Sequence, residues 1–142
     1  MLTKYETSFT VYPTETNPMS PLIFGGAFFS QLDKAAATVV RRAIYSSDTC
    51  ETSVTHKWEG TFHKPCYLGD LIHVIAEVVS MGHKSVVVEV KAKRENPPEP
   101  GMSDPVLELV AEAKFVFVTV KNADDVAGKP KLLPYVNHGL TM

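Results

Sequence analysis

Residues 24–46 read FGGAFFSQLDKAAATVVRRAIYS, and apolar side chains recur through this stretch at spacings of three and four residues. One such series is Phe28, Leu32, Ala35 and Val39. This spacing is typical of a helix that buries one face. We therefore predict a helix from Ala27 to about Ser46, roughly 30 Å long at ~1.5 Å per residue.

The segments around this helix are rich in β-branched and aromatic residues, which favour strands. The predicted strands are residues 5–12, 51–62, 71–81, 85–95 and 106–120. Between residues 85 and 93, small apolar residues alternate with charged ones, so one face of an antiparallel sheet is expected to be buried and the other wetted. Residues 94–105 contain four prolines and are predicted to form an exposed loop outside the sheet.

One long helix with five strands, in a chain of 142 residues that is 44% hydrophobic, predicts a single α+β domain over residues 1–142. Residues from about 135 to 142 are expected to form a flexible tail. A single helix covers only part of a sheet this wide, so apolar surface is left over for a second subunit. We therefore expect a homodimer.

Composition argues against several classes of function. The formal net charge is −2, without the basic excess that nucleic-acid binding needs. No run of 18 apolar residues is present, and the N-terminal residues MLTKYETSF lack the apolar core of a signal peptide, so we expect a cytoplasmic protein without membrane contact. Cys50 and Cys66 are not in a C-x-x-C spacing and the histidines lack zinc-site spacings, so no metal is predicted.

Two glycines at the predicted start of the helix suggest a place for chemistry. The backbone amides of a first helical turn lack partners and carry partial positive charge, so Gly25 and Gly26 could present an amide to a developing oxyanion. Asp33 follows about two turns later, among the apolar residues Phe29 and Ala36. The alternatives are that the glycines only form a tight turn and that Asp33 is a surface carboxylate.

Three segments in order resemble the hotdog-fold acyl-CoA thioesterases, in which an antiparallel sheet wraps a long central helix. The clearest is FGGAFFSQLD at residues 24–33, which is similar to the loop and helix start that carry the family's catalytic acid. FHKPCYLGD at residues 62–70 is similar to the family's F-x-x-P-x-x-x-G-D turn. AEAKFVFV at residues 111–118 is a weaker third segment.

The resemblance implies roles for individual residues in thioester hydrolysis. Asp33 becomes the general base or the nucleophile, and the amide of Gly25 or Gly26 polarises the thioester carbonyl. Thr55 lies where relatives often have a Ser or Thr that contacts the water or the acid, although it is equally an ordinary strand residue. Asn17 is one residue further from the glycines than in many relatives, and a one-residue insertion would still let it orient water or the carbonyl.

The expected substrate is an acyl-CoA thioester, with no separate cofactor. Four residues are expected to contact it: Phe24, His83, Lys84 and Ser85. Self-association as a dimer, or as a tetramer or hexamer built from dimers, is expected, because the resemblance places the site between subunits.

The sequence argues against one other function and leaves a second one open. A hotdog dehydratase would need a catalytic histidine, and the predicted helix has none. A non-catalytic module that binds acyl-CoA or an acyl carrier would keep the fold without turnover, and the shifted Asn17 is compatible with it.

Overall fold

The computed structural model describes residues 3–44, 51–82, 85–122 and 130–132. The predicted tail at residues 135–142 lies outside them. The elements, in chain order, are β1 (Lys4–Thr10), the short 3₁₀ helix η1 (Pro13–Glu15), α1 (Gly25–Ile44), β2 (Glu51–Phe62), β3 (Leu71–Met81), β4 (Ser85–Asn96), β5 (Val106–Asn122) and β6 (Pro130–Leu132).

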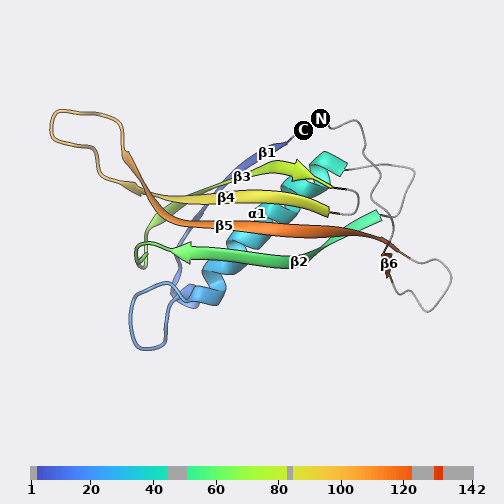
Figure 1. Ribbon diagram of the computed structural model, residues 1–142. Helices are drawn as coiled ribbons and strands as arrows, with labels where there is room; N and C mark the ends of the chain where they lie inside the picture. The colour runs from blue at the N-terminus through green and yellow to red at the C-terminus, as the bar shows by residue number, and fades with distance from the viewer. Residues whose placement is uncertain (1–2, 45–50, 83–84, 123–129, 133–142) are drawn as a thin grey trace.

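The strands form one antiparallel sheet in the order β1-β3-β4-β5-β2, and β6 pairs with the end of β5. The helix α1 lies across one face of this sheet, and the β4–β5 loop projects beyond the end of the sheet (Figure 1). The α+β class and the antiparallel sheet are therefore confirmed. β1 and β2 are the two ends of the strand order.

The helix α1 begins two residues earlier than predicted. Its first residue is Gly25, and the amide of Phe28 donates to the carbonyl of Phe24 at 3.0 Å, which closes the first turn. Neither Gly25 nor Gly26 is among the glycines with positive φ. Both glycines are therefore helical residues, and the alternative of a tight turn before the helix is wrong. The predicted helix end at Ser46 lies outside the described residues.

The strand β4 continues past the point where a loop was predicted. Arg94, Glu95 and Asn96 pair with Glu108, Leu107 and Val106 of β5, so these three residues belong to the sheet. The prediction that residues 94–105 stay outside the sheet was wrong for its first three residues, because the first proline, the residue that cannot donate to a ladder, is Pro97. β6 was not predicted.

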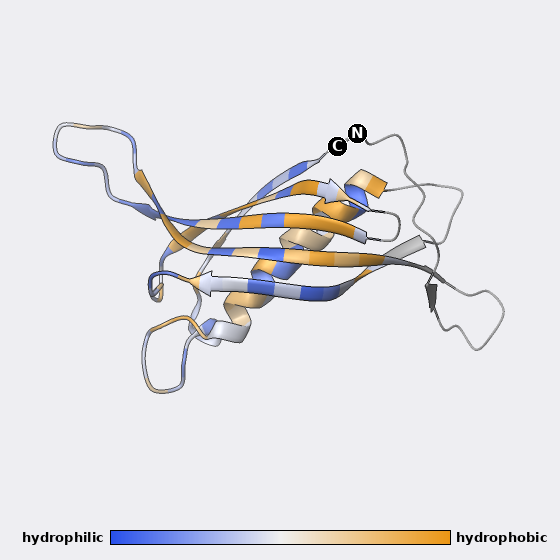
Figure 2. Ribbon diagram, in the orientation of Figure 1, coloured by the Kyte–Doolittle hydropathy of each residue, from blue (hydrophilic) through white to orange (hydrophobic). Residues whose placement is uncertain are grey.

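The core lies between α1 and the inner face of the sheet, and Figure 2 shows hydrophobic residues recurring along both. The alternating residues of β4 predicted to be buried, Val86, Val88, Val90 and Ala92, are at most 1% exposed. On the helix, Ala36 and Val39 are fully buried, so the helix backbone lies close to the strands. Each such valine contributes about 1.5–3 kcal/mol through removal from water.

Candidate functional site

Asp33 and Thr55 come together although 22 residues separate them in the chain. Asp33 lies on α1 and Thr55 on β2, and the Thr55 hydroxyl donates to the Asp33 carboxylate at 2.7 Å. Both are residues for which the family resemblance implied a role. The bond orients the carboxylate and leaves the lone pairs of the Thr55 oxygen able to accept a hydrogen bond from a water or ligand.

A β-bulge in β2 turns Thr55 toward the helix. Trp58 pairs with Phe115 and Thr55 with Phe117. Between these pairs, the two β2 residues His56 and Lys57 lie opposite the single β5 residue Val116, so His56 is the extra residue. Phe115 and Phe117 are both buried on the inner face of the sheet. The extra residue therefore keeps both Trp58 and Thr55 on the face that meets α1.

The start of α1 has room for a close approach at one glycine but not at the other. A Cβ added to Gly25 would meet only the Phe62 ring, at an ordinary 3.8 Å. A Cβ on Gly26 would lie 2.8 Å from Cε1 of Phe24, whose side chain is 54% exposed. A side chain at Gly26 would therefore displace the ring of Phe24, the residue expected to contact substrate.

Asn17 holds the loop that leads into the helix. Its backbone amide donates to the carbonyl of Leu22 at 2.8 Å, and its side-chain nitrogen lies 3.4 Å from that carbonyl and 3.5 Å from the carbonyl of Ile23. The side chain thus fixes the last residues before Phe24. Although Asn17 is one residue further from the glycines than in many relatives, it still contacts the loop next to the helix start.

The predicted site residues lie in more than one place within one chain. Eight residues along α1 separate Gly25 from Asp33, a distance of about 12 Å. Ser85 is the first residue of β4. The β4 residue in register with the end of β2, near Gly25, is Ala92, which lies seven residues or roughly 23 Å further along the strand. His83 and Lys84 lie outside the described residues.

Aromatic residues line β2 beside the helix and stay half exposed. The rings of Phe29 and Trp58 have centroids 4.7 Å apart, and those of Phe28 and Phe62 are 5.1 Å apart. Trp58 is nevertheless 54% exposed and Phe62 52%. Within the described ranges, β2 also has no strand neighbour on its outer edge.

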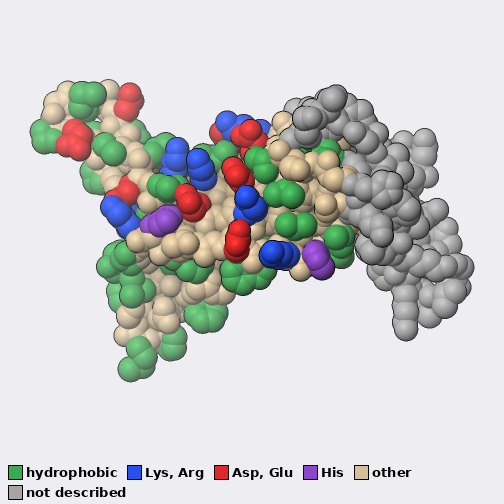
Figure 3. All heavy atoms as spheres, viewed as in Figure 1, with side chains coloured by type: hydrophobic (Ala, Val, Ile, Leu, Met, Phe, Trp, Pro, Cys, Tyr) green, Lys and Arg blue, Asp and Glu red, His purple; other side chains and the backbone are tan. Residues whose placement is uncertain are grey.

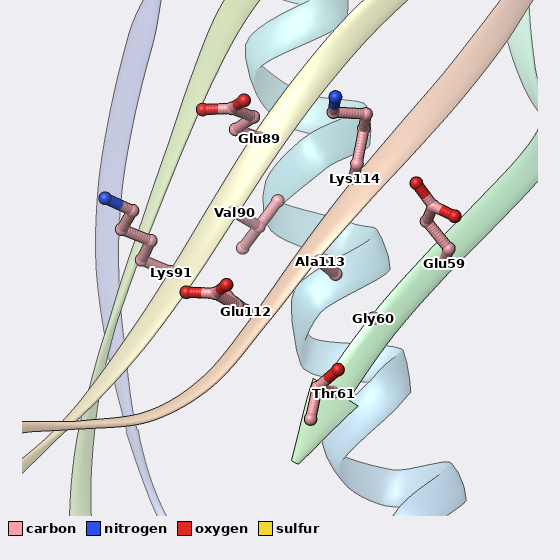
Figure 4. A pocket seen from close by; sticks show the side chains of 9 residues that line it. All are labelled: Glu59, Gly60, Thr61, Glu89, Val90, Lys91, Glu112, Ala113 and Lys114. Atoms are coloured by element: carbon pink, nitrogen blue, oxygen red, sulfur yellow. The ribbon is translucent and has the colours of Figure 1, made fainter. Parts of the chain in front are cut away.

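The opposite face of the sheet is charged. Figure 3 views this face and shows basic and acidic side chains intermixed across its middle. A hollow of about 560 Å³ there is lined by side chains of β2, β4 and β5 (Figure 4). Opposite charges alternate across its strands, as in the row Glu59, Lys114 and Glu89. Because α1 and Asp33 lie on the other side of the sheet, this hollow is separate from the candidate site.

The turn at residues 65–70, part of the second resembling segment, packs against the loop before α1. Asp70 accepts from the amide of Tyr67 at 2.8 Å, and Gly69 has a φ of 90°, a conformation that favours glycine.

Burial raises the pKa of the Cys66 thiol to about 11, so this thiol stays protonated and is a poor nucleophile.

On the sequence, Arg94 is one of several cations available to the phosphates of coenzyme A, and its contacts with the turn at residues 65–70 were not predicted. A usable signal was present, because Arg94 and Glu108 have opposite charges on the two sides of the proline-rich loop and a hairpin would pair them.

Among the described residues, no three His, Cys, Asp or Glu side chains gather closely enough to hold a metal ion. None of the helices described is both long and apolar enough to span a bilayer.

A long helix lying in the curve of one antiparallel sheet is the architecture of the hotdog class. The profile of the thioesterase superfamily matches residues 21–100. The chain therefore belongs to the thioesterase superfamily. No curated protein matches it in a sequence search.

Three solved structures illustrate the likeness. An acyl-CoA hydrolase from Staphylococcus aureus, in complex with butyryl coenzyme A, coenzyme A and coenzyme A disulfide, is 26% identical, with a TM-score of 0.70 over 92% of this chain and 71% of that one. A hexameric hotdog-fold thioesterase from Campylobacter jejuni is 27% identical, with a TM-score of 0.69 over 92% and 88%. A hexameric thioesterase from Yersinia pestis is 27% identical, with a TM-score of 0.65 over 91% and 93%.

The Staphylococcus aureus hydrolase has also been solved as three variants. In these an aspartate, an asparagine or a threonine is replaced by alanine.

Proposed function

We propose that this protein hydrolyses acyl-CoA thioesters to a free acid and coenzyme A. The observation that carries the proposal is the hydrogen bond of 2.7 Å between Thr55 and Asp33, which sets an oriented carboxylate beside β2 in a chain of the thioesterase superfamily. Thioester hydrolysis needs such a base, together with a donor for the oxygen that becomes negative. Gly25 and Gly26 supply amide donors at the start of the same helix.

Comparison with the Staphylococcus aureus hydrolase supports this assignment. The residue types replaced in its variants, asparagine, aspartate and threonine in chain order, are those of Asn17, Asp33 and Thr55. The spacings are 15 and 17 residues in that enzyme, and 16 and 22 residues here. The extra residue before Asp33 agrees with the shift of Asn17.

The reaction follows from these groups. Asp33 takes a proton from a water that also hydrogen-bonds to Thr55, and the water oxygen attacks the thioester carbon. The carbonyl oxygen becomes negative and is held by the amide of Gly25 or Gly26. When the carbon–sulfur bond breaks, the sulfur of coenzyme A leaves with the electron pair, and Asp33 returns the proton to it.

The proposed site is shared between two copies of the chain. In one chain Asp33 stands about 12 Å along the helix from Gly25, too far for both to reach one carbonyl group. The two groups lie beside different parts of β2, because Gly25 is near Phe62 whereas Asp33 is bonded to Thr55. Antiparallel pairing of two β2 strands, centred between Thr55 and Phe62, would set the Asp33 of one copy near the Gly25 of the other.

A test of this function measures coenzyme A release from a panel of acyl-CoAs of increasing chain length. We expect Asp33→Asn to lower kcat by at least ~10² with little change in KM, because a positioned base contributes about 10²–10⁴ in rate. Thr55→Val should lower kcat less, and Thr55→Ser should retain most of it. Lys34→Gln, which alters an exposed neighbour on the same helix, is the matched control.

Two results would contradict the proposal. Tight acyl-CoA binding by the wild type without turnover would favour the binding-module alternative. Transfer of oxygen-18 from labelled water into the Asp33 carboxylate during turnover would replace the general-base role of Asp33 by a nucleophilic one.

A further inference from the structure

Arg94 is a partly buried cation that contacts four groups from three parts of the chain. Its side chain is 17% exposed. The guanidinium donates to the carbonyl of Pro65 at 2.7 Å, to the Glu108 carboxylate, and to the side-chain oxygen of Asn96 at 3.1 Å, and it lies 3.6 Å from the Asp70 carboxylate. The five donors of an arginine in a rigid fork suit such a junction, whereas a lysine could satisfy only part of it.

The junction keeps its charge at any working pH. Hydrogen bonds from Lys64, Arg94 and Asn96 lower the pKa of Glu108 to about 2. Arg94 therefore faces an ionised carboxylate under all conditions in which the protein would be assayed. Charge-assisted bonds of this kind are stronger than neutral ones and define direction.

Arg94 holds both ends of the turn at residues 65–70. It binds the carbonyl of Pro65 at one end and approaches the carboxylate of Asp70 at the other. The middle of the turn pairs with the loop before the helix, since Leu68 donates to the carbonyl of Pro21 at 2.8 Å.

The paired loop leads directly into the helix start. The amide of Ile23 donates to the carbonyl of Cys66 at 2.8 Å, and the next residue, Phe24, closes the first helical turn with its own carbonyl. The contacts thus run from the Arg94 guanidinium to the turn, from the turn to residues 21–23, and from there to Gly25. Asp33 and Thr55 lie outside this path.

We propose that Arg94 is a positioning residue that sets the location of the Gly25 and Gly26 amides through the turn at residues 65–70. The catalytic part of this inference rests on the proposed function. A displacement near 1 Å at a reacting group costs about 10² in rate, so a group far from the substrate can act through geometry alone.

The test compares Arg94→Met and Arg94→Lys with Lys91→Met, a matched control that removes an exposed cation from the same strand. Each purified variant is assayed for kcat and KM with an acyl-CoA and for hydrogen exchange of its backbone amides. Arg94→Met should lower kcat by 10- to 100-fold with KM changed less than threefold. Exchange should speed up at residues 21–28 but not at residues 35–43.

Arg94→Lys should show the same pattern to a smaller degree, and it decides the outcome if Arg94→Met is not recovered folded. Unchanged exchange at residues 21–28 in a variant that has lost the contact would overturn the positioning role. A lower thermal midpoint with wild-type kcat would also overturn it, because a purely structural residue behaves in that way. A wild type that releases no coenzyme A would overturn the proposed function, while the exchange measurement would still decide whether Arg94 sets the helix start.

Discussion

The two edge strands of the sheet, β1 and β2, differ in the kind of side chain that they expose to water. β1 has seven residues, and its exposed positions Lys4, Glu6 and Ser8 are polar. β2 has twelve residues and leaves Trp58 and Phe62 half exposed beside an edge that could accept another strand. Short polar edges prevent unwanted pairing, whereas long apolar edges invite it. We therefore propose that β2, rather than β1, is the edge that pairs with a second copy.

The largest expected effect comes from placing a charge on the β2 edge. Trp58→Glu should weaken self-association by at least ~10², because two like charges near a two-fold axis cost several kcal/mol. Turnover should fall with the dimer, since the proposed site needs both copies. Light scattering and sedimentation across a concentration series measure the association.

The matched variant Ser8→Glu puts the same charge on β1 and should leave both association and turnover unchanged. A wild-type protein that is monomeric at micromolar concentration would contradict the proposed role of β2.

A smaller effect is expected at the helix start, which adjoins the β2 edge at Phe62. Because both glycines are helical, alanine at Gly25 has room and should stabilise the fold by about 0.4–1 kcal/mol. Alanine at Gly26 should push the exposed Phe24 ring aside. If either amide binds the thioester oxygen, at least one variant should lose about 10-fold or more in kcat while its thermal midpoint stays close to that of the wild type.

Full turnover in both alanine variants would show that the oxyanion donor lies elsewhere. The measurement therefore separates ligand access from helix propensity, the two reasons for glycine at this point.

The smallest effect concerns pH and the Glu108 junction, which adjoins the end of β2 through Lys64. The pKa of Glu108 is lowered from 4.5 to about 2 in the folded protein, so its contribution to stability is complete above pH 4.5 and is lost as the pH falls toward 2. Glu108→Gln should be less stable than the wild type at pH 7, and the difference should shrink below pH 4.5. Urea unfolding at pH 7 and pH 3 measures it, and a constant difference would contradict the assignment.

Local pattern predicted most of the fold. The bounds of β2 and β3 agree with the predicted strands, because alternation and turn residues mark them in the chain itself. The start of α1 was missed by two residues because glycine has a low helix propensity, and the contact between Phe28 and Phe24 overrides it. The predicted strand at residues 85–95 ends one residue before β4 does, but the start of the loop was placed too early, at Arg94, because of the prolines that follow.

The candidate site was predictable only in part. Family resemblance pointed to Asp33 and Thr55, and the structure brings them into contact. Periodicity alone could not pair them, because 22 residues and a change from helix to strand separate them. The contacts of Arg94 depend on the register between β4 and β5, which no local pattern contains.

The bulge at His56 has a consequence for how such a chain can change over evolutionary time. Side chains alternate across a strand with a period of two, so the extra residue acts as a phase shift between the half of β2 that carries Trp58 and the half that carries Thr55. Losing His56 would leave both Thr55 and Asp33 in the sequence and still rotate the Thr55 hydroxyl to the far side of the sheet. In a lineage of such proteins, a one-codon deletion at this point could therefore remove the partner of Asp33 as completely as a substitution would.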